Sequence, residues 1–170
     1  MSPPNHPQNP RVALQADHAQ IEALIEGLLD RVRANEETEA LRVWRVLEPA
    51  LLAHLDAEEE YLLPALDEAE QAECEQIRNE HSQIRRTLGE LGMALELHTA
   101  RAEPIVAFCA FLKAHAERED SLLYSSAERH MPEVVARSLV SRLRAIGIHP
   151  KRASAGRAGD RVRSAKVGGR

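Results

Sequence analysis

The chain has few aromatic residues, few cysteines and no long apolar run. Only 3% of its 170 residues are aromatic, which argues against a nucleic-acid surface built on base stacking. No stretch approaches the ~18 consecutive apolar residues of a membrane span, and the opening MSPPNHPQNP does not resemble a secretory signal. The two cysteines, Cys74 and Cys109, fall at different heights on neighbouring predicted helices, too far apart for a disulfide. We therefore expect a cytoplasmic protein with free thiols and no membrane partner.

The formal net charge of −5 combines an acidic body with a basic C-terminal segment. Residues 150–170 carry a balance of +6, which leaves −11 on the remainder. An acidic body does not favour binding to phosphate backbones, because that affinity comes from basic side chains. The last segment is rich in Gly, Ala and Arg, so we expect residues 149–170 to be a disordered basic tail, chiefly a solubilising extension. Contact with nucleic acid is therefore conceivable only through this basic tail.

Strand-like alternation is also lacking, and helix-forming residues dominate from residue 10 onward. We expect residues 1–9 to be a flexible N-terminus, Asn9 and Pro10 to start the first helix, and Asn35 to cap the second. Pro49 predicts a kink or break within the second helix, and Gly147 is expected to end the last one. The predicted apolar stripes run through residues 14–32, 44–65, 74–95, 105–122 and 135–143.

Four long helices joined by short connections predict an all-α domain over residues 10–148. Their expected arrangement is an up-down-up-down antiparallel four-helix bundle, because short connections make consecutive helices antiparallel neighbours. The short fifth helix is expected to pack across one end.

Six polar residues occupy positions that continue the apolar spacing of the four long helices. In an antiparallel bundle, residues at one height on consecutive helices are equidistant from the turn between them. The midpoints of 18 and 54, of 58 and 81, and of 81 and 119 are 36, 69.5 and 100, and each lies beside a predicted turn. We therefore expect one polar layer in the middle of the bundle: His18, His54, Glu58, His81, His115 and Glu119.

This residue set indicates a metal site. Burying an unpartnered imidazole or carboxylate costs several kcal/mol, and two buried carboxylates repel each other unless protons or cations intervene. Two His-x-x-x-Glu pairs and two further histidines offer nitrogen and oxygen donors that suit iron, manganese or zinc. Each glutamate can bridge two ions. Four imidazole nitrogens and four carboxylate oxygens then give four donors per ion, so coordination positions remain for a small ligand. The alternative is a metal-free helical interaction domain in which the six residues satisfy one another.

Other residues near this layer have plainer interpretations. Glu22 and Asp120 remain candidates for additional ligands, whereas Glu59 is expected to be solvated or to lie behind the ligands. Tyr61 and Phe108 are expected to be core aromatics, and Tyr61 could also hydrogen-bond to the site. The histidines outside the layer are expected at the surface: His6, His98, His130 and His149.

The motifs resemble those of the hemerythrin-like family, also called the HHE cation-binding domain. The resemblance covers about residues 11–130 and rests on DH at 17–18, HLDAEEEYLLP from His54, EH at 80–81 and HAEREDSLLY from His115. The two long motifs also align with each other. The resemblance implies a four-helix bundle with a non-haem di-iron centre, in which the four histidines are terminal ligands and Glu58 and Glu119 bridge two iron ions. Members of this family carry oxygen, sense oxygen, iron or redox state, or handle iron and nitric oxide stress.

One position departs from the family pattern. Oxygen-carrying members place a second histidine four residues after His81, where this chain has Arg85, which cannot ligate while protonated. We expect Arg85 to turn toward an acid such as Glu22 or toward an exogenous anion. The departure favours a module that binds or senses oxygen, iron, or the redox or nitrosative state, with dioxygen or another small diatomic as ligand. The alternative is a di-iron oxidase or iron-handling stress enzyme, although the Glu-x-x-His pairs of ferritin-like oxidases are missing.

Overall fold

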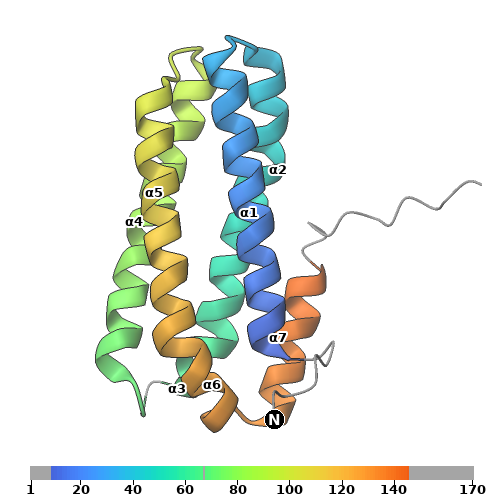
Figure 1. Ribbon diagram of the computed structural model, residues 1–170, viewed down its shortest axis with the longest axis vertical. Helices are drawn as coiled ribbons and strands as arrows, with labels where there is room; N and C mark the ends of the chain where they lie inside the picture. Colours follow the sequence, from blue (N-terminus) through green and yellow to red (C-terminus); the bar gives the residue numbers. More distant parts are fainter. Residues whose placement is uncertain (1–8, 67, 146–170) are drawn as a thin grey trace, which may run out of the picture.

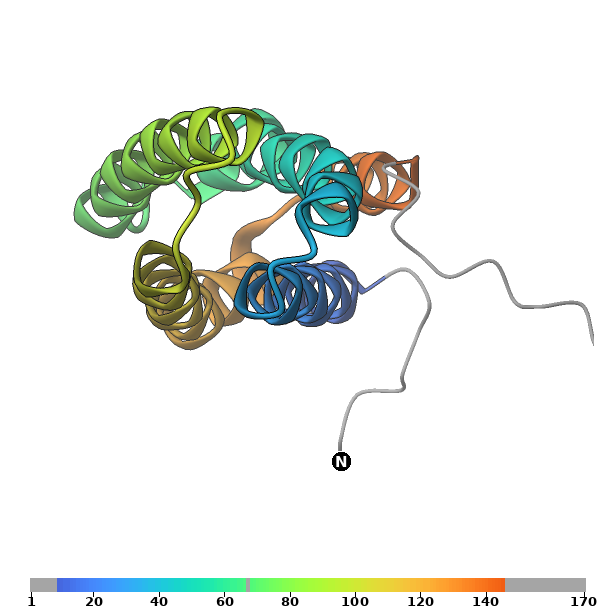
Figure 2. The same cartoon turned by 90° about the horizontal axis from the view of Figure 1, so that it is seen from above.

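The computed structural model describes residues 9–66 and 68–145, and every regular element in those residues is helical. The all-α prediction is therefore confirmed for this part of the chain. The predicted flexible N-terminus through residue 8, the stop at Gly147 and the basic tail lie outside the described residues. Four long helices run side by side (Figures 1 and 2): α1 (Pro10–Arg33), α2 (Glu37–Ala57), α4 (Gln71–Glu96) and α5 (Ala102–Arg118).

The α1–α2 and α4–α5 connections lie at the same end of the bundle, at the top of Figure 1, and are built alike. Asn35 and His98 adopt left-handed conformations with φ of 56° and 55°. In both turns the next amide donates to a carbonyl five residues earlier, at 2.9 and 2.8 Å, as in a Schellman motif. Asn35 therefore ends α1, and α2 begins after Glu36 without a side-chain cap. The predicted cap at Asn35 is wrong.

The start of α1 follows the sequence prediction, whereas the break considered at Pro49 is absent. The Asn9 side chain accepts a hydrogen bond from the Arg11 amide at 2.9 Å, and Pro10 occupies the first helical position. Pro49 lies inside α2, which continues without a break from Glu37 to Ala57. The helical spacing first changes nine residues after Pro49, at Glu58, directly after the end of α2.

One turn of π-helix follows α2, and another follows α5. The first, η1, covers Glu58–Leu62, and the second, η2, covers Glu119–Leu123. In each turn the amide five residues later, Leu63 or Tyr124, donates to the carbonyl of the glutamate. A π-turn adds one residue relative to α-helical spacing, so the following side chains point in different directions than an unbroken α-helix would give. The short helices α3 (Leu63–Leu66) and α6 (Tyr124–His130) continue these two segments.

This change of register corrects part of the predicted core. Tyr61 is only partly buried and Leu122 is 43% exposed, although the α-helical spacing places both on the core face. Leu63 and Tyr124 are instead fully buried. Phe108, which lies before the π-turn of its helix, is buried as predicted.

The apolar core consists of two clusters, one toward each end of the bundle. The first contains Trp44, Leu88 and Phe108 and joins α1, α2, α4 and α5. Helices α2 and α4 approach closely there, since a Cβ atom at Gly92 would lie 3.2 Å from the Trp44 ring. The second cluster includes Leu14 and Tyr124 and lies around the π-turns. The polar layer described below is positioned between these two clusters.

The last described helix, α7 (Glu133–Ala145), buries Leu139 and Leu143 in the second core cluster. It contacts α1, α2 and η1 and lies alongside them in Figures 1 and 2. It therefore covers the side of the bundle, and the expectation that it crosses the end is wrong. None of the helices in the described residues is long and apolar enough to cross a membrane.

Candidate metal centre

The structure brings all six residues of the predicted polar layer together. Their donor atoms form two groups, in each of which the atoms lie within 4.8 Å of one another. The two groups share Glu58 and Glu119, the first residues of the two π-turns. We call them cluster 1 (His18, His54, Glu58 and Glu119) and cluster 2 (Glu58, His81, His115 and Glu119).

Each shared glutamate directs one oxygen to each cluster. Glu119 Oε2 lies 3.2 Å from His18 Nε2, and Glu119 Oε1 lies 3.2 Å from His115 Nε2. Glu58 Oε1 lies 3.5 Å from His54 Nε2, and Glu58 Oε2 lies 3.4 Å from His81 Nε2. This is the arrangement expected of two carboxylates that bridge a pair of cations.

The donor atoms of cluster 2 are buried polar atoms without hydrogen bonds in the described part of the chain. An unsatisfied buried polar group costs roughly 1–3 kcal/mol, and a cation placed among the donors would remove that cost for all of them. The residues present therefore fit a metal ion, and imidazole with carboxylate suits iron, manganese or zinc. The atoms concerned are Glu58 Oε2, His81 Nε2, His115 Nε2 and Glu119 Oε1.

The buried charges of the two clusters compensate one another. Burial opposes the charging of His81, but the carboxylates of Glu119 and Glu58 raise its pKa to about 10. Burial also disfavours ionised Glu119, yet the His18 and His81 rings hold the pKa of that carboxyl well below its usual range. A proton on the His81 imidazole therefore balances charge on the buried carboxylates.

Three of the four histidines have a carboxylate beside the ring nitrogen that faces away from the clusters, with a hydrogen bond at His81 and His115 and a longer ion-pair contact at His54. Such a carboxylate fixes the ring orientation and leaves Nε2 directed at the metal position. Two of these acids directly precede a histidine in the sequence, in the DH and EH pairs, but each reaches the histidine of the following long helix. The pairs, with the Nδ1–oxygen distances, are Asp17 with His54 (3.5 Å), Glu59 with His81 (2.9 Å) and Glu80 with His115 (2.8 Å).

Two arginines extend this arrangement behind cluster 2. Arg85 donates to Glu59 at 2.7 Å and to Asp56 at 2.7 Å, and Arg118 donates to Glu80. Burial alone would raise the pKa of Glu59, but the hydrogen bond from Arg85 lowers it. Arg85 therefore turns away from the cluster toward acids, as expected, although those acids are not Glu22.

The two candidates for additional ligands lie outside both clusters. Glu22 forms an ion pair with Lys113, with 2.6 Å between the carboxylate oxygen and Nζ. Asp120 lies 3.0 Å from Arg11 and accepts a hydrogen bond from Gln15 at 2.6 Å. Both carboxylates are thus engaged with cationic or amide groups near the surface.

A family comparison agrees with this geometry. The Hemerythrin HHE cation binding domain family matches residues 9–127. The chain belongs to this hemerythrin family. The matched range contains all six residues of the two clusters, and the family prediction from the motifs is confirmed. No curated protein and no solved structure matches the chain.

Tyr124 is a residue of this hemerythrin domain that the sequence reasoning missed. Its hydroxyl lies 3.2 Å from Glu58 Oε1, 3.3 Å from His18 Nε2 and 3.4 Å from Glu119 Oε2. Burial and the two neighbouring carboxylates raise the pKa of this phenol well above its usual value. Tyr61, considered for this position from the sequence, is only partly buried. The sequence signal for Tyr124 was the alignment of the two long motifs, in which Tyr124 occupies the same position as Leu63. Both residues are fully buried in the structure.

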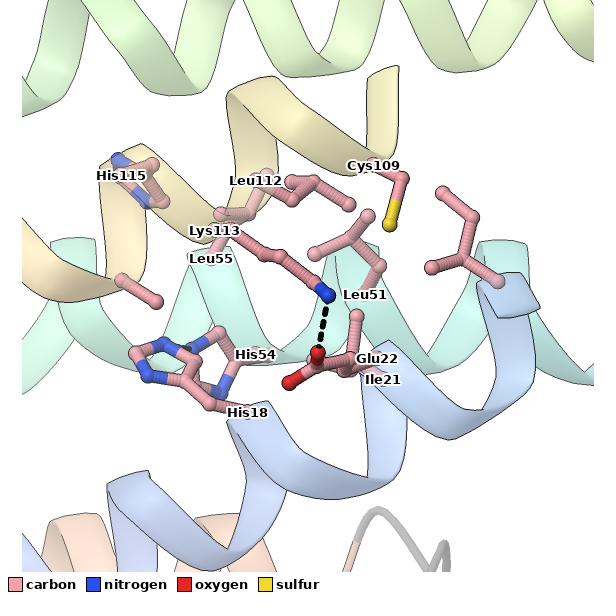
Figure 3. Close-up of a pocket in the computed structure, with 12 residues that line it drawn as sticks. His18, Ile21, Glu22, Leu51, His54, Leu55, Cys109, Leu112, Lys113 and His115 are labelled. Atoms are coloured by element: carbon pink, nitrogen blue, oxygen red, sulfur yellow. Dashed lines mark hydrogen bonds and ion pairs between the residues drawn. The ribbon is translucent and has the colours of Figure 1, made fainter. Parts of the chain in front are cut away.

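A small cavity lies beside cluster 1, between α1, α2 and α5 (Figure 3). Its volume is about 50 Å³, and the imidazoles of His18, His54 and His115 form part of its wall. The ion pair between Lys113 and Glu22 crosses it in Figure 3. The rest of the wall is mostly apolar and includes Ile21, Ile25, Leu51, Leu55, Cys109 and Leu112.

Proposed function

We propose that this hemerythrin domain binds two iron ions and senses a small uncharged ligand, such as dioxygen or another diatomic molecule. The observation that best supports two ions is the pair of clusters that share Glu58 and Glu119 through separate carboxylate oxygens. An ion in cluster 1 alone would leave the buried donors of cluster 2 unsatisfied. The protein is, on this proposal, a binding and sensing module.

The proposed ligand roles follow from the distances. His18 and His54 are terminal ligands in cluster 1, and His81 and His115 are terminal ligands in cluster 2. With both glutamates as bridges, each ion receives about four protein donors, fewer than the six that iron commonly accepts. Ferrous iron in such an unsaturated site supplies an open coordination position and an exchangeable electron.

Two features support a small ligand and a sensing role. The cavity beside His18 and His54 is small and mostly apolar, which favours an uncharged ligand over a charged or bulky one. Arg85, at the position of the additional histidine in oxygen carriers, is held by Asp56 and Glu59. It therefore contributes no ligand to cluster 2, and this supports sensing over reversible oxygen transport.

Metal analysis tests the first part of the proposal. The full chain is reconstituted with ferrous iron without air, analysed for metal, and then exposed to air while its absorption spectrum is followed. We expect two iron ions per chain, a spectral change with oxygen, and a higher melting temperature than that of the metal-free protein. One ion per chain, or tight binding of zinc alone with no oxygen-dependent change, would contradict the di-iron proposal.

A pair of variants tests the route of the ligand. Cys109→Phe places a ring in the wall of the cavity, whereas Ala110→Phe places the same ring on the exposed face of α5. Both are expected to retain iron. Stopped-flow mixing with oxygen or nitric oxide should show slower reaction for Cys109→Phe and an unchanged rate for Ala110→Phe. Equal rates for all three proteins would exclude this cavity as the ligand route.

A further inference from the structure

In the described residues, the Tyr124 hydroxyl contacts only atoms of cluster 1. The residue is fully buried, and the three partners of its hydroxyl are His18 Nε2, Glu58 Oε1 and Glu119 Oε2, at 3.2–3.4 Å. All three are donor atoms of the proposed metal site. No partner outside this group is found for the hydroxyl in the described residues. A role in ordinary core packing therefore does not explain the position of this oxygen.

Hydrogen bonding alone accounts poorly for this position. A phenol carries one hydrogen and can donate it to one acceptor at a time, yet the oxygen lies about equally far from two carboxylate oxygens and one imidazole nitrogen. A single proton leaves at least one carboxylate oxygen facing the phenol oxygen without a hydrogen between them. A cation among these atoms would attract all of them together.

The spacing of the atoms is that of ligands around one ion. Metal–ligand bonds of roughly 2.1 Å place neighbouring ligand atoms about 3.0 Å apart at right angles and about 3.4 Å apart at the tetrahedral angle. The two imidazole Nε2 atoms of cluster 1 lie 3.0 Å apart, and His18 Nε2 lies 3.2 Å from Glu119 Oε2. The phenol oxygen keeps the same spacing from its three neighbours.

We propose that Tyr124 is a direct metal ligand of cluster 1, the fifth protein donor beside His18, His54, Glu58 and Glu119. When the ion binds, the phenol O–H bond breaks, its proton passes to solvent, and the phenolate oxygen donates an electron pair to the cation. This inference rests on the proposed metal binding. It makes the two positions chemically different, since cluster 2 has no tyrosine.

The chain contains two tyrosines, which provides a matched control. Tyr124→Phe removes the buried hydroxyl and keeps the ring, whereas Tyr61→Phe removes a hydroxyl that belongs to neither cluster. The full-length proteins are loaded with iron, oxidised, analysed for metal, and examined by visible absorption and resonance Raman spectroscopy. Phenolate bound to ferric iron gives a visible charge-transfer band, and excitation in that band enhances the ring vibrations of the phenolate.

We expect these vibrations in the natural protein and in Tyr61→Phe, and their complete loss in Tyr124→Phe. Zinc loading of Tyr61→Phe at neutral pH should also give the near-ultraviolet difference spectrum of one tyrosinate per chain. If Tyr124→Phe does not fold, Tyr61→Phe still decides, because Tyr124 is then the only tyrosine. Iron-loaded Tyr61→Phe without phenolate vibrations would overturn the tyrosine ligand and leave the metal site standing. Absence of bound metal in the natural protein would overturn both proposals.

Discussion

Clusters 1 and 2 have the same number of histidines and share both glutamates, but their surroundings differ. In cluster 2 the His81 and His115 side chains are 0% and 4% exposed, and each has a glutamate on Nδ1 that is itself paired with an arginine. In cluster 1 the His18 side chain is 16% exposed and borders the cavity. Cluster 2 is therefore the more enclosed of the two, and cluster 1 is the more exposed.

The difference arises from few side chains within two similar motifs. Glu59 follows Glu58 and reaches His81 Nδ1, while Asp120 follows Glu119 at the aligned position and pairs with Arg11 instead. The aspartate is one methylene shorter than the glutamate. A repeated sequence thus builds two similar donor clusters, and single differences between the repeats make them unequal.

The largest expected effect comes from replacing a shared carboxylate, because both clusters should then lose their metal together. Glu58→Ala or Glu119→Ala removes donor atoms from both clusters, so we expect loss of nearly all bound iron. The exposed Glu117→Ala is the control and should keep full metal content. Elemental analysis after identical reconstitution provides the measurement. A variant that keeps one ion per chain would show that the glutamate does not bridge.

Removing one histidine at a time should distinguish the metal binding of the two clusters. His81→Ala is expected to remove the ion of cluster 2 and His18→Ala to weaken mainly that of cluster 1, which leaves about one tightly bound ion per chain in each case. If added imidazole takes the place of the missing side chain and restores the second ion only in His18→Ala, the more open surroundings of cluster 1 are supported. Identical behaviour of the two variants would contradict the assigned difference.

The carboxylates behind the histidines should have intermediate effects. Asp17→Asn and Glu80→Gln keep the shape of the side chain but remove its charge, and each should lower metal affinity about tenfold, the former at cluster 1 and the latter at cluster 2. Competition with a chelator would measure this as a change in one of two release steps. Glu117→Gln is the matched surface control. A change in both steps with either variant would mean that the clusters do not release metal independently.

The smallest effect is expected from the C-terminus. Deletion of residues 150–170 removes no residue of either cluster and none of the matched family range, so helicity and metal content should stay unchanged. Circular dichroism and elemental analysis test this. A large loss of helix would show that the segment contributes to the folded structure.

Periodicity predicts the polar layer because the four helices are regular as far as the glutamates. Up to Glu58 and Glu119 the spacing is α-helical, so the distance from each turn places the six residues at one height. Beyond those residues the same periodicity selects Tyr61 and Leu122, whereas the π-turns direct Leu63 and Tyr124 inward. Periodicity also says nothing about which acid reaches across to which imidazole, since that depends on side-chain length and the local approach of two helices.

The π-turns also make the chain unequally tolerant of changes in length. Deleting one residue within Glu58–Leu62 would place Leu63 four residues after Glu58, and α-helical spacing would then keep its side chain directed toward the second core cluster. A deletion between Leu97 and Arg101, where two long helices are merely connected, alters neither the spacing before Glu119 nor the spacing after it. A deletion in the regular part of α2 would instead turn every later side chain of that helix by about 100°, so a comparison of related sequences should place a one-residue gap at the π-turns.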